Sequence, residues 1–339
     1  MSAEFGLGTL VSNSPAPALP VDLAMVLEAG QRLAGAVRLT PLAPLSSLSE
    51  RAGRDVLGKL ECFQVTGSFK ARGALNRVLT LGEEERRRGV WTASAGNHAQ
   101  GVAWAAARAG CRATVVMGRS SSPLKQAKTR RLGAEVILHG NDYDDAEAWA
   151  IEQARESGCA FVHAFEDPEV MAGQGTLVLE MAAQRARLGS IVVPVGGGGL
   201  LSGIAVAARA LYPGARLVGV QSDASPAFVR ALESGGPVDT PVEESIADGL
   251  TGRWAGKVTY RVIAALCDGV RSVREAEIAR AMRWLLEEEG LLVEPSAAVP
   301  VAALLSGALE DLPGPLALIL SGGNVHPDIL RRVLGAGPS

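Results

Sequence analysis

The sequence is poor in aromatic residues, in sustained positive charge and in long apolar runs. Aromatic residues make up 4% of the 339 residues, the formal net charge is -3, and no long run of lysine and arginine occurs. A nucleic-acid platform and a basic membrane-binding face are therefore disfavoured. No apolar run approaches the length of a membrane span. We expect no nucleic-acid partner and no membrane contact.

The cysteines argue against a disulfide framework or a zinc site, and the first residues argue against a secreted protein. The four cysteines, at positions 62, 111, 159 and 267, are scattered and include no CxxC pair, which is typical of reduced thiols in a cytoplasmic protein. The first twenty residues contain neither lysine nor arginine, so a signal peptide is not expected. Residues 1–20 are predicted to form a disordered tail.

Short β-rich runs that alternate with helical spacing are abundant. From about residue 55 onward they include "VWTAS", "ATVVMG", "AEVILHG", "FVHA", "IVVPV", "RLVGV" and "LALILSGG". This alternation predicts an α/β fold with open, mostly parallel twisted sheets flanked by helices. Gly110, Gly133 and Gly158 are predicted to end helices, and Ser272 with Glu275 is predicted to form a capping box before "IARAMRWLL".

Three loops after predicted strands carry candidate functional residues, because ligands bind at the carboxyl ends of parallel strands. The four glycines at 196–199 can direct several N–H groups at one anion, best a phosphate, although a tight structural turn is an equal alternative. The loop "SAGNHAQG", residues 94–101, can hold a carboxylate, or Ser94 or Asn97 can simply cap a helix. Ser321 can bond a ring nitrogen or cap the next turn.

Lys70 follows Gly67, Ser68 and Phe69 in the stretch "QVTGSFKARGA". A surface lysine at a helix start is the simplest interpretation of this residue alone. Burial and nearby positive potential would instead lower its pKa and permit Schiff-base chemistry. A reactive lysine beside an aromatic ring, a phosphate cradle, an asparagine and a lone hydroxyl together fit pyridoxal 5'-phosphate as cofactor.

Six motifs occur in one order along the chain: "KLECFQVTGSFKARGA", "SAGNHAQG", "AGQGTLVLE", "VPVGGGGLLSGIA", "ADGL" and "LSGGN". In these motifs the chain resembles the threonine/serine dehydratase and serine racemase family of fold-type II pyridoxal-phosphate enzymes, from about residue 21 to residue 334. The resemblance implies a large cofactor-binding domain of residues 21–82 and 167–339, a small mobile domain of residues 83–166, and a homodimer.

The resemblance also implies a role for each matching residue. Lys70 would bind the cofactor aldehyde and later move the substrate's α-proton, and Ser321 would meet the pyridine nitrogen. Phe69 would pack beside the cofactor ring, and Asn97 would bond the ring hydroxyl. The phosphate would be held by Gly196, Gly197, Gly198, Gly199 and the Leu200 amide. The substrate carboxylate would be received by Ser94, Ala95, Gly96, Asn97 and His98.

The chain departs from the family pattern at informative positions. The resemblance implies that racemases carry a second serine at Ala95 as the opposite-face base, so elimination is favoured over racemisation. Their metal-binding carboxylates would fall near Gln221 and Ala227, and no metal site is expected because neither side chain is anionic. "HAF" at residues 163–165 replaces the more usual His-Pro-Phe. Because few residues follow Ser321, we expect no regulatory domain.

The expected activity is β-elimination of a β-hydroxy-L-amino acid, such as threonine or serine, to a 2-oxo acid and ammonia. Serine racemisation, or dehydration of a bulkier substrate such as 3-hydroxyaspartate or a β-arylserine, is the nearest alternative. A nucleotide-dependent oxidoreductase is disfavoured because the GxGxxG fingerprint is missing after an early strand. A non-catalytic cofactor-binding protein is the third alternative.

Overall fold

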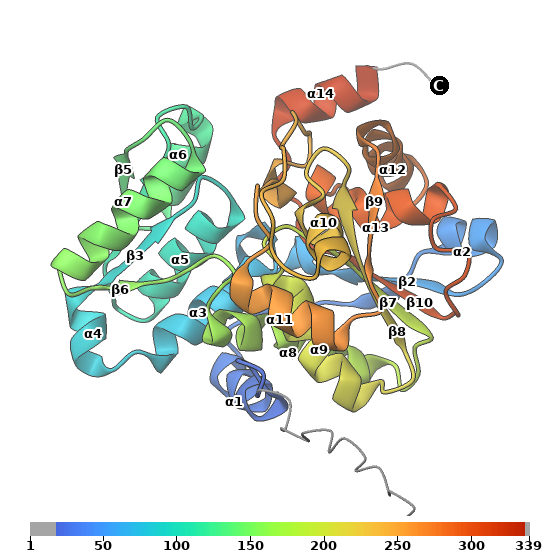
Figure 1. Cartoon of the computed structure of the whole chain (residues 1–339), viewed down its shortest axis with the longest axis horizontal. Helices are drawn as coiled ribbons and strands as arrows, with labels where there is room; N and C mark the ends of the chain where they lie inside the picture. Colours follow the sequence, from blue (N-terminus) through green and yellow to red (C-terminus); the bar gives the residue numbers. More distant parts are fainter. Residues whose placement is uncertain (1–17, 336–339) are drawn as a thin grey trace, which may run out of the picture.

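The computed structural model of the protein describes residues 18–335. Most of the predicted tail of residues 1–20 therefore lies outside the described residues. Two β-sheets with helices on both faces make up the described chain (Figure 1). Within residues 18–335, no helix is both long and apolar enough to cross a membrane.

The larger sheet has six strands in the order β1-β2-β10-β7-β8-β9. Only β1 is antiparallel to its neighbour, and the other pairs are parallel. The strands are β1 (Leu42–Pro44), β2 (Val56–Leu60), β7 (Ser190–Pro194), β8 (Arg216–Ser222), β9 (Val270–Val273) and β10 (Leu316–Leu320).

Alternate residues of the central strands fill two separate cores, because successive side chains of a strand point to opposite faces. In β10, Ala317 and Ile319 join the core under α1, α8, α9 and α11, whereas Leu316, Leu318 and Leu320 join the core under α2, α12 and α13. The helices that accompany this sheet are α1 (Leu23–Leu33), α2 (Ser46–Ala52), α3 (Lys70–Thr80), α8 (Pro168–Gln184), α9 (Gly199–Leu211), α10 (Ala227–Ser234), α11 (Lys257–Leu266), α12 (Glu275–Glu287), α13 (Pro295–Leu305) and α14 (Pro327–Gly335).

The smaller sheet is parallel throughout, in the order β5-β4-β3-β6. Its strands are β3 (Val90–Ala93), β4 (Ala113–Met117), β5 (Glu135–Leu138) and β6 (Ala160–Phe161), and its helices are α4 (Glu83–Arg88), α5 (Asn97–Arg108), α6 (Pro123–Arg131) and α7 (Tyr143–Glu156). All of these elements fall within residues 83–166, and the six strands of the larger sheet fall outside that range. Figure 1 shows the smaller sheet in green and cyan beside the larger one.

The predicted helix ends at three glycines are confirmed. Gly110, Gly133 and Gly158 each lie two residues beyond the ends of α5, α6 and α7, and their φ angles are 64°, 94° and 63°. These left-handed conformations are the ones that glycine adopts at helix ends without a steric cost.

The predicted capping box is wrong. Ser272 lies inside β9, and α12 instead begins after Arg274, whose N–H donates to the Glu277 carboxylate over 2.8 Å. The Glu275 carboxylate accepts hydrogen bonds from the Ser245 hydroxyl and from the Ile246 N–H, which lie 30 and 29 residues away along the chain. Tertiary contacts thus displace the local pairing that the spacing suggested.

Candidate active site

The loops that follow three neighbouring strands of the larger sheet lie next to one another. β2, β10 and β7 are adjacent, and they lead into residues 61–69, 321–324 and 196–199. Ser68 pairs with Gly322 in an isolated bridge, and the Phe69 N–H donates to the Ser321 carbonyl over 3.1 Å. The motifs around Lys70 and Ser321 therefore meet at one edge of the sheet.

Lys70 is the first residue of α3, and its amine lies close to the Ala164 carbonyl and the Phe69 ring. Its Nζ donates to the Ala164 carbonyl over 2.8 Å and lies 5.3 Å from the centre of the Phe69 ring. Burial lowers the pKa of Lys70 to about 8, although the Glu294 carboxylate acts in the opposite direction. A larger fraction of the amine is thus neutral near neutral pH than in a solvated lysine, which favours nucleophilic chemistry.

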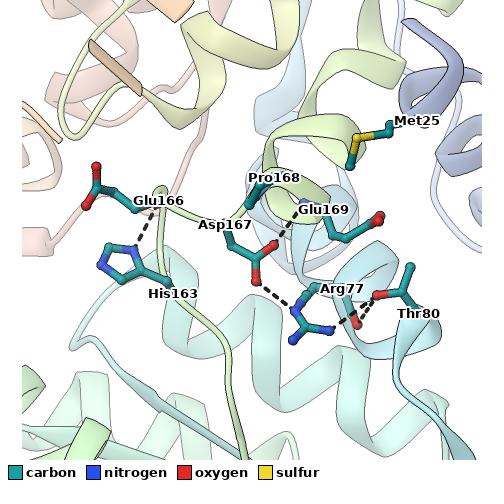
Figure 2. Close-up of a pocket in the computed structure, with 8 residues that line it drawn as sticks. All are labelled: Met25, Arg77, Thr80, His163, Glu166, Asp167, Pro168 and Glu169. Carbon is teal, nitrogen blue, oxygen red and sulfur yellow. Dashed lines mark hydrogen bonds and ion pairs between the residues drawn. The ribbon is translucent and has the colours of Figure 1, made fainter. Parts of the chain in front are cut away.

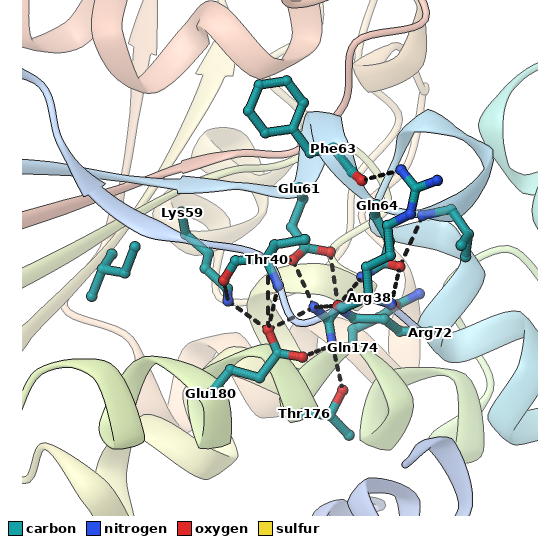
Figure 3. A network of polar contacts seen from close by, with 12 residues as sticks. Arg38, Thr40, Lys59, Glu61, Phe63, Gln64, Arg72, Gln174, Thr176 and Glu180 are labelled. Atoms are coloured by element: carbon teal, nitrogen blue, oxygen red, sulfur yellow. Dashed lines mark hydrogen bonds and ion pairs between the residues drawn. The ribbon is translucent and has the colours of Figure 1, made fainter. Parts of the chain in front are cut away.

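A buried network of charges anchors the segment that carries Lys70 (Figure 3). The Arg72 guanidinium donates two hydrogen bonds to Glu61 and two to Glu180, all between 2.7 and 2.9 Å. Lys59 adds an ion pair of 2.6 Å to Glu180. The side chains of Arg72 and Glu61 are fully buried. Residues 61 and 72 are thereby tied together on either side of Lys70.

The glycine loop at residues 196–199 leaves no room for side chains. A Cβ on Gly197 would lie 2.3 Å from the Phe165 ring, and one on Gly199 would lie 2.9 Å from Phe165 Cα. Gly198 has a φ of 88° and opens α9, in which Leu200 is the second residue. In the described part of the chain, the N–H groups of residues 196–200 form no hydrogen bond to protein. Free N–H groups at a helix start favour an anion.

The loop before α5 does not use a side-chain cap, so the capping alternative for Ser94 and Asn97 is not what the structure contains. The N-cap position belongs to Gly96, and Asn97 is the first helical residue. The Ser94 hydroxyl accepts from the Gly96 N–H over 3.1 Å. Ala95 is half-buried and packs against the core of the smaller sheet.

Asn97 is held by two residues of the larger sheet's loops. Its Nδ2 donates to Glu294 over 2.7 Å, and its Oδ1 accepts from Asn324 over 2.8 Å. These bonds bring the loop after β3 to the loop after β10. The start of α5 also contacts the start of α3, because a Cβ on Gly101 would lie 3.1 Å from the Lys70 carbonyl.

Glu294 is a site residue that the sequence reasoning missed. It directly precedes α13, and its N–H donates to the Gly322 carbonyl over 3.0 Å. Burial raises the pKa of Glu294 to about 7, although the hydrogen bond from Asn97 acts to lower it. A lone acid inside the apolar run "LLVEPSAAVPVAALL", residues 291–305, was a signal that could have identified it.

Two histidines near Lys70 are held neutral. His98 is buried, its Nε2 lies 3.0 Å from the Val162 carbonyl, and burial lowers its pKa to about 3. The side chain thus packs within its own sheet. Burial also lowers the pKa of His163 to about 4. The Nδ1 of His163 accepts from the N–H groups of Phe165 and Glu166, which fixes the turn that contacts Lys70 and the glycine loop.

Two hydroxyls near Lys70 have no hydrogen-bond partner within residues 18–335. Ser321 is a buried residue, 3% exposed, and its hydroxyl makes no hydrogen bond within the described residues. The Ser68 hydroxyl is buried and unpaired. Phe69, between these loops, packs against the core of the larger sheet. Unpaired buried polar groups are uncommon in native proteins, so they mark a place where a ligand can supply the partner.

Structural roles are filled by Gln221 and Ala227, the two positions that the resemblance matches to racemase metal ligands. The Gln221 side chain accepts from the Phe228 N–H and donates to the Val195 carbonyl, and Ala227 is the first residue of α10. Among the described residues, no group of three or more metal-binding side chains occurs. The absence of a metal site stays a prediction.

An open groove of about 540 Å³ is lined in part by His163 and Glu166 of the turn at residues 163–166 (Figure 2). Arg77 and Asp167, two of its lining residues, form an ion pair of 2.7 Å. Neither Lys70 nor the glycine loop contributes to this groove. It is lined by Met25, Arg77, Thr80, His163, Glu166, Asp167, Pro168 and Glu169.

Comparison with known proteins points to one family. Residues 33–322 match the model of the family described as pyridoxal-phosphate dependent enzyme. The chain is 44% identical over 313 residues to an L-threonine ammonia-lyase from Geobacter sulfurreducens, covering 92% of this chain and 78% of that protein. A crystal structure of a T.th. threonine deaminase is 40% identical, with a TM-score of 0.84, and the match covers 90% of this chain and 99% of that one. A serine racemase from Dictyostelium discoideum is 34% identical, also with a TM-score of 0.84, over 91% of this chain and 99% of that one.

Proposed function

Because the chain belongs to the pyridoxal-phosphate-dependent enzymes, we propose that it is an ammonia-lyase that acts on threonine and serine. The reaction would eliminate the β-hydroxyl as water, and a second water would then release ammonia and leave a 2-oxo acid. The observation that carries this proposal is the convergence of Lys70, the glycine loop and Ser321 at the ends of three adjacent strands.

The residues present fit pyridoxal 5'-phosphate. The free N–H groups of residues 196–200 would hold the phosphate, and Phe165 packs so closely against Gly197 and Gly199 that only glycine fits at either position. The unpaired Ser321 hydroxyl would meet the ring nitrogen, and Asn97 would bond the ring hydroxyl. When bound, the cofactor supplies an electron sink for the bond that breaks at the substrate's α-carbon.

Lys70 would hold the cofactor through Nζ and then take the substrate's α-proton at the same atom. Its lowered pKa supports both tasks, because a nucleophile and a base must each be neutral to act. Ser321 offers a neutral hydroxyl to the ring nitrogen, which stabilises positive charge there less than a carboxylate would. We therefore expect elimination of the β-hydroxyl to follow proton loss rapidly.

The substrate carboxylate would bind at the uncapped start of α5. Ser94, Ala95, Gly96, Asn97 and His98 form this turn, and without a side-chain cap the helix start offers N–H groups and its positive dipole to an anion. His98 would contribute through its backbone, since its side chain is directed to Val162.

A panel of β-hydroxy amino acids tests the activity. The purified protein, loaded with pyridoxal 5'-phosphate, is given L-threonine, L-serine, 3-hydroxyaspartate and β-phenylserine, and oxo acid and ammonia are measured for each. We expect the highest kcat/KM with L-threonine and equal amounts of oxo acid and ammonia. Absence of oxo acid from both L-threonine and L-serine would refute the proposal.

Racemisation is the second candidate, because serine racemases are among the similar solved structures. Ala95 weighs against it, since alanine offers no hydroxyl as a second base. Chiral analysis of the L-serine reaction separates the two activities. Formation of D-serine faster than oxo acid would favour the racemase.

We also propose a cytoplasmic homodimer in which residues 83–166 form a small domain that closes on the substrate. The strands of residues 83–166 form a sheet of their own, which supports this division, and four cysteines without a disulfide suit a reducing compartment. Small-angle scattering should give about twice the chain mass of 35.1 kDa and a smaller radius of gyration with a substrate analogue bound. The mass of a monomer would contradict the proposed dimer, and an unchanged radius of gyration would contradict the proposed closure. Cell fractionation tests the cytoplasmic location.

A further inference from the structure

Thr259 is a fully buried residue in the first turn of α11 that reaches the glycine loop. Its hydroxyl lies 2.8 Å from the Gly197 carbonyl oxygen and 3.2 Å from that of Gly256. A hydroxyl in a helix commonly donates to a carbonyl three or four residues earlier, which here is Gly256. The Thr259 hydroxyl has one proton to donate, and its nearer acceptor is the Gly197 carbonyl, 62 residues away in the sequence.

The start of α11 is itself fixed in place. The Glu166 carboxylate accepts a hydrogen bond of 2.7 Å from the Val258 N–H, and a Cβ on Gly256 would lie 2.7 Å from the same carboxylate. Glu166 directly follows Phe165, whose ring lies against Gly197. The turn, the helix start and the glycine loop therefore pack as one unit.

The hydrogen bond from Thr259 to the Gly197 carbonyl also sets the direction of the Gly198 N–H group. A peptide unit is planar and trans, so the Gly197 carbonyl and the Gly198 N–H point in opposite directions. Since Thr259 holds the carbonyl on the side of α11, the Gly198 N–H points away from that helix. In the described residues this N–H has no protein acceptor.

We propose that Thr259 is a positioning residue that orients the Gly197–Gly198 peptide so that its N–H donates to the cofactor phosphate. The inference rests on the proposed phosphate-binding role of the glycine loop. Thr259 itself touches neither cofactor nor substrate. Its hydroxyl sets the direction of one donor before the ligand arrives, and pre-set donors bind an anion more tightly than donors that must reorient.

The test compares two ligands on the apoprotein: pyridoxal 5'-phosphate, and pyridoxal, which lacks the phosphate. Thr259→Val removes the hydroxyl at nearly constant volume, and Thr259→Ser retains it. We expect Thr259→Val to bind pyridoxal 5'-phosphate roughly tenfold more weakly, with unchanged affinity for pyridoxal. Thr259→Ser should restore most of the loss. The ³¹P resonance of the bound cofactor should shift in Thr259→Val and stay close to wild type in Thr259→Ser.

Thr129→Val is the matched control. Thr129 is also buried, and its hydroxyl donates to the Lys125 carbonyl within α6, away from the glycine loop. This variant should lose thermal stability without a change in affinity for either ligand. If Thr259→Val does not fold, Thr259→Ala is measured by the same criteria.

The inference is overturned if the Thr259 variant without a hydroxyl binds pyridoxal 5'-phosphate as tightly as wild type, or if both ligands weaken equally. Wild-type protein that fails to bind pyridoxal 5'-phosphate would instead overturn the cofactor assignment. The two failures are therefore distinguishable.

Discussion

Replacing Lys70 with alanine is expected to abolish turnover and the visible absorbance of the bound cofactor. The variant loses the amine proposed to hold the cofactor and to move the α-proton. General-base catalysis alone contributes about 10²–10⁴-fold, so the decrease in kcat should be at least about 10²-fold. Both quantities can be followed in one spectrophotometric assay with L-threonine.

Two controls give this prediction its specificity. Lys70→Arg keeps a positive charge and a long side chain, but arginine remains protonated and should be equally inactive. Lys128→Ala removes a lysine of α6, outside the proposed site, and should retain activity. A Lys70→Ala protein with more than about one per cent of wild-type turnover would refute the proposed role.

Replacing Arg72 with methionine is expected to cause the largest loss of stability. The substitution leaves Glu61, which is fully buried, without its bidentate partner and deprives Glu180 of two further hydrogen bonds. Removing one member of a buried ion pair typically costs about 3–5 kcal/mol. For a protein of this size the midpoint of thermal unfolding should fall by roughly 10 °C, as circular dichroism would measure.

Arg77→Met on the same helix is the matched control. The Arg77–Asp167 pair is partly exposed, so its loss should cost about 1 kcal/mol or less. Equal losses in the two variants would contradict the importance assigned to the buried network. Because residues 61 and 72 lie on either side of Lys70, Arg72→Met should also weaken cofactor binding in protein that remains folded.

The same network predicts a sensitivity to acid. Burial alone would raise the pKa of Glu61, but the charge and hydrogen bonds of Arg72 hold it below the usual value of 4.5. A carboxyl whose pKa is lower in the folded state contributes its full stabilisation above about pH 4.5 and loses it as the pH falls through the lowered value. The stability difference between wild type and Arg72→Met should therefore shrink in acid.

Much of the fold could be predicted because its signals are local. The central strands β7 and β10 are largely apolar runs of five residues. Gly110, Gly133 and Gly158 end helices because glycine adopts the left-handed backbone angles found there without a steric cost. The prediction agrees least well with the structure at β6. Of the run "FVHA", only Phe161 lies in this strand, and His163 forms the turn that follows. The short edge strands β1 and β9 were not predicted from an apolar run.

The parts of the site that were missed depend on contacts between distant segments. Glu294 precedes a proline at a helix start, which resembles an ordinary first turn, and only the fold brings it to Asn97. Thr259 reaches Gly197 across 62 residues, and Arg72 reaches Glu180 across 108. No periodicity or local motif encodes such pairs. Glu275 illustrates the converse, since tertiary partners displaced the local capping role its spacing predicted.

The identity of the cofactor-bearing side chain is the most direct test of the account. The purified protein is treated with borohydride, which fixes pyridoxal 5'-phosphate to the amine that holds it, and its peptides are then mapped by mass. The account predicts one modified residue, Lys70, at one label per chain, with none in Lys70→Ala. Modification of another lysine, or no stable label at all, would contradict it.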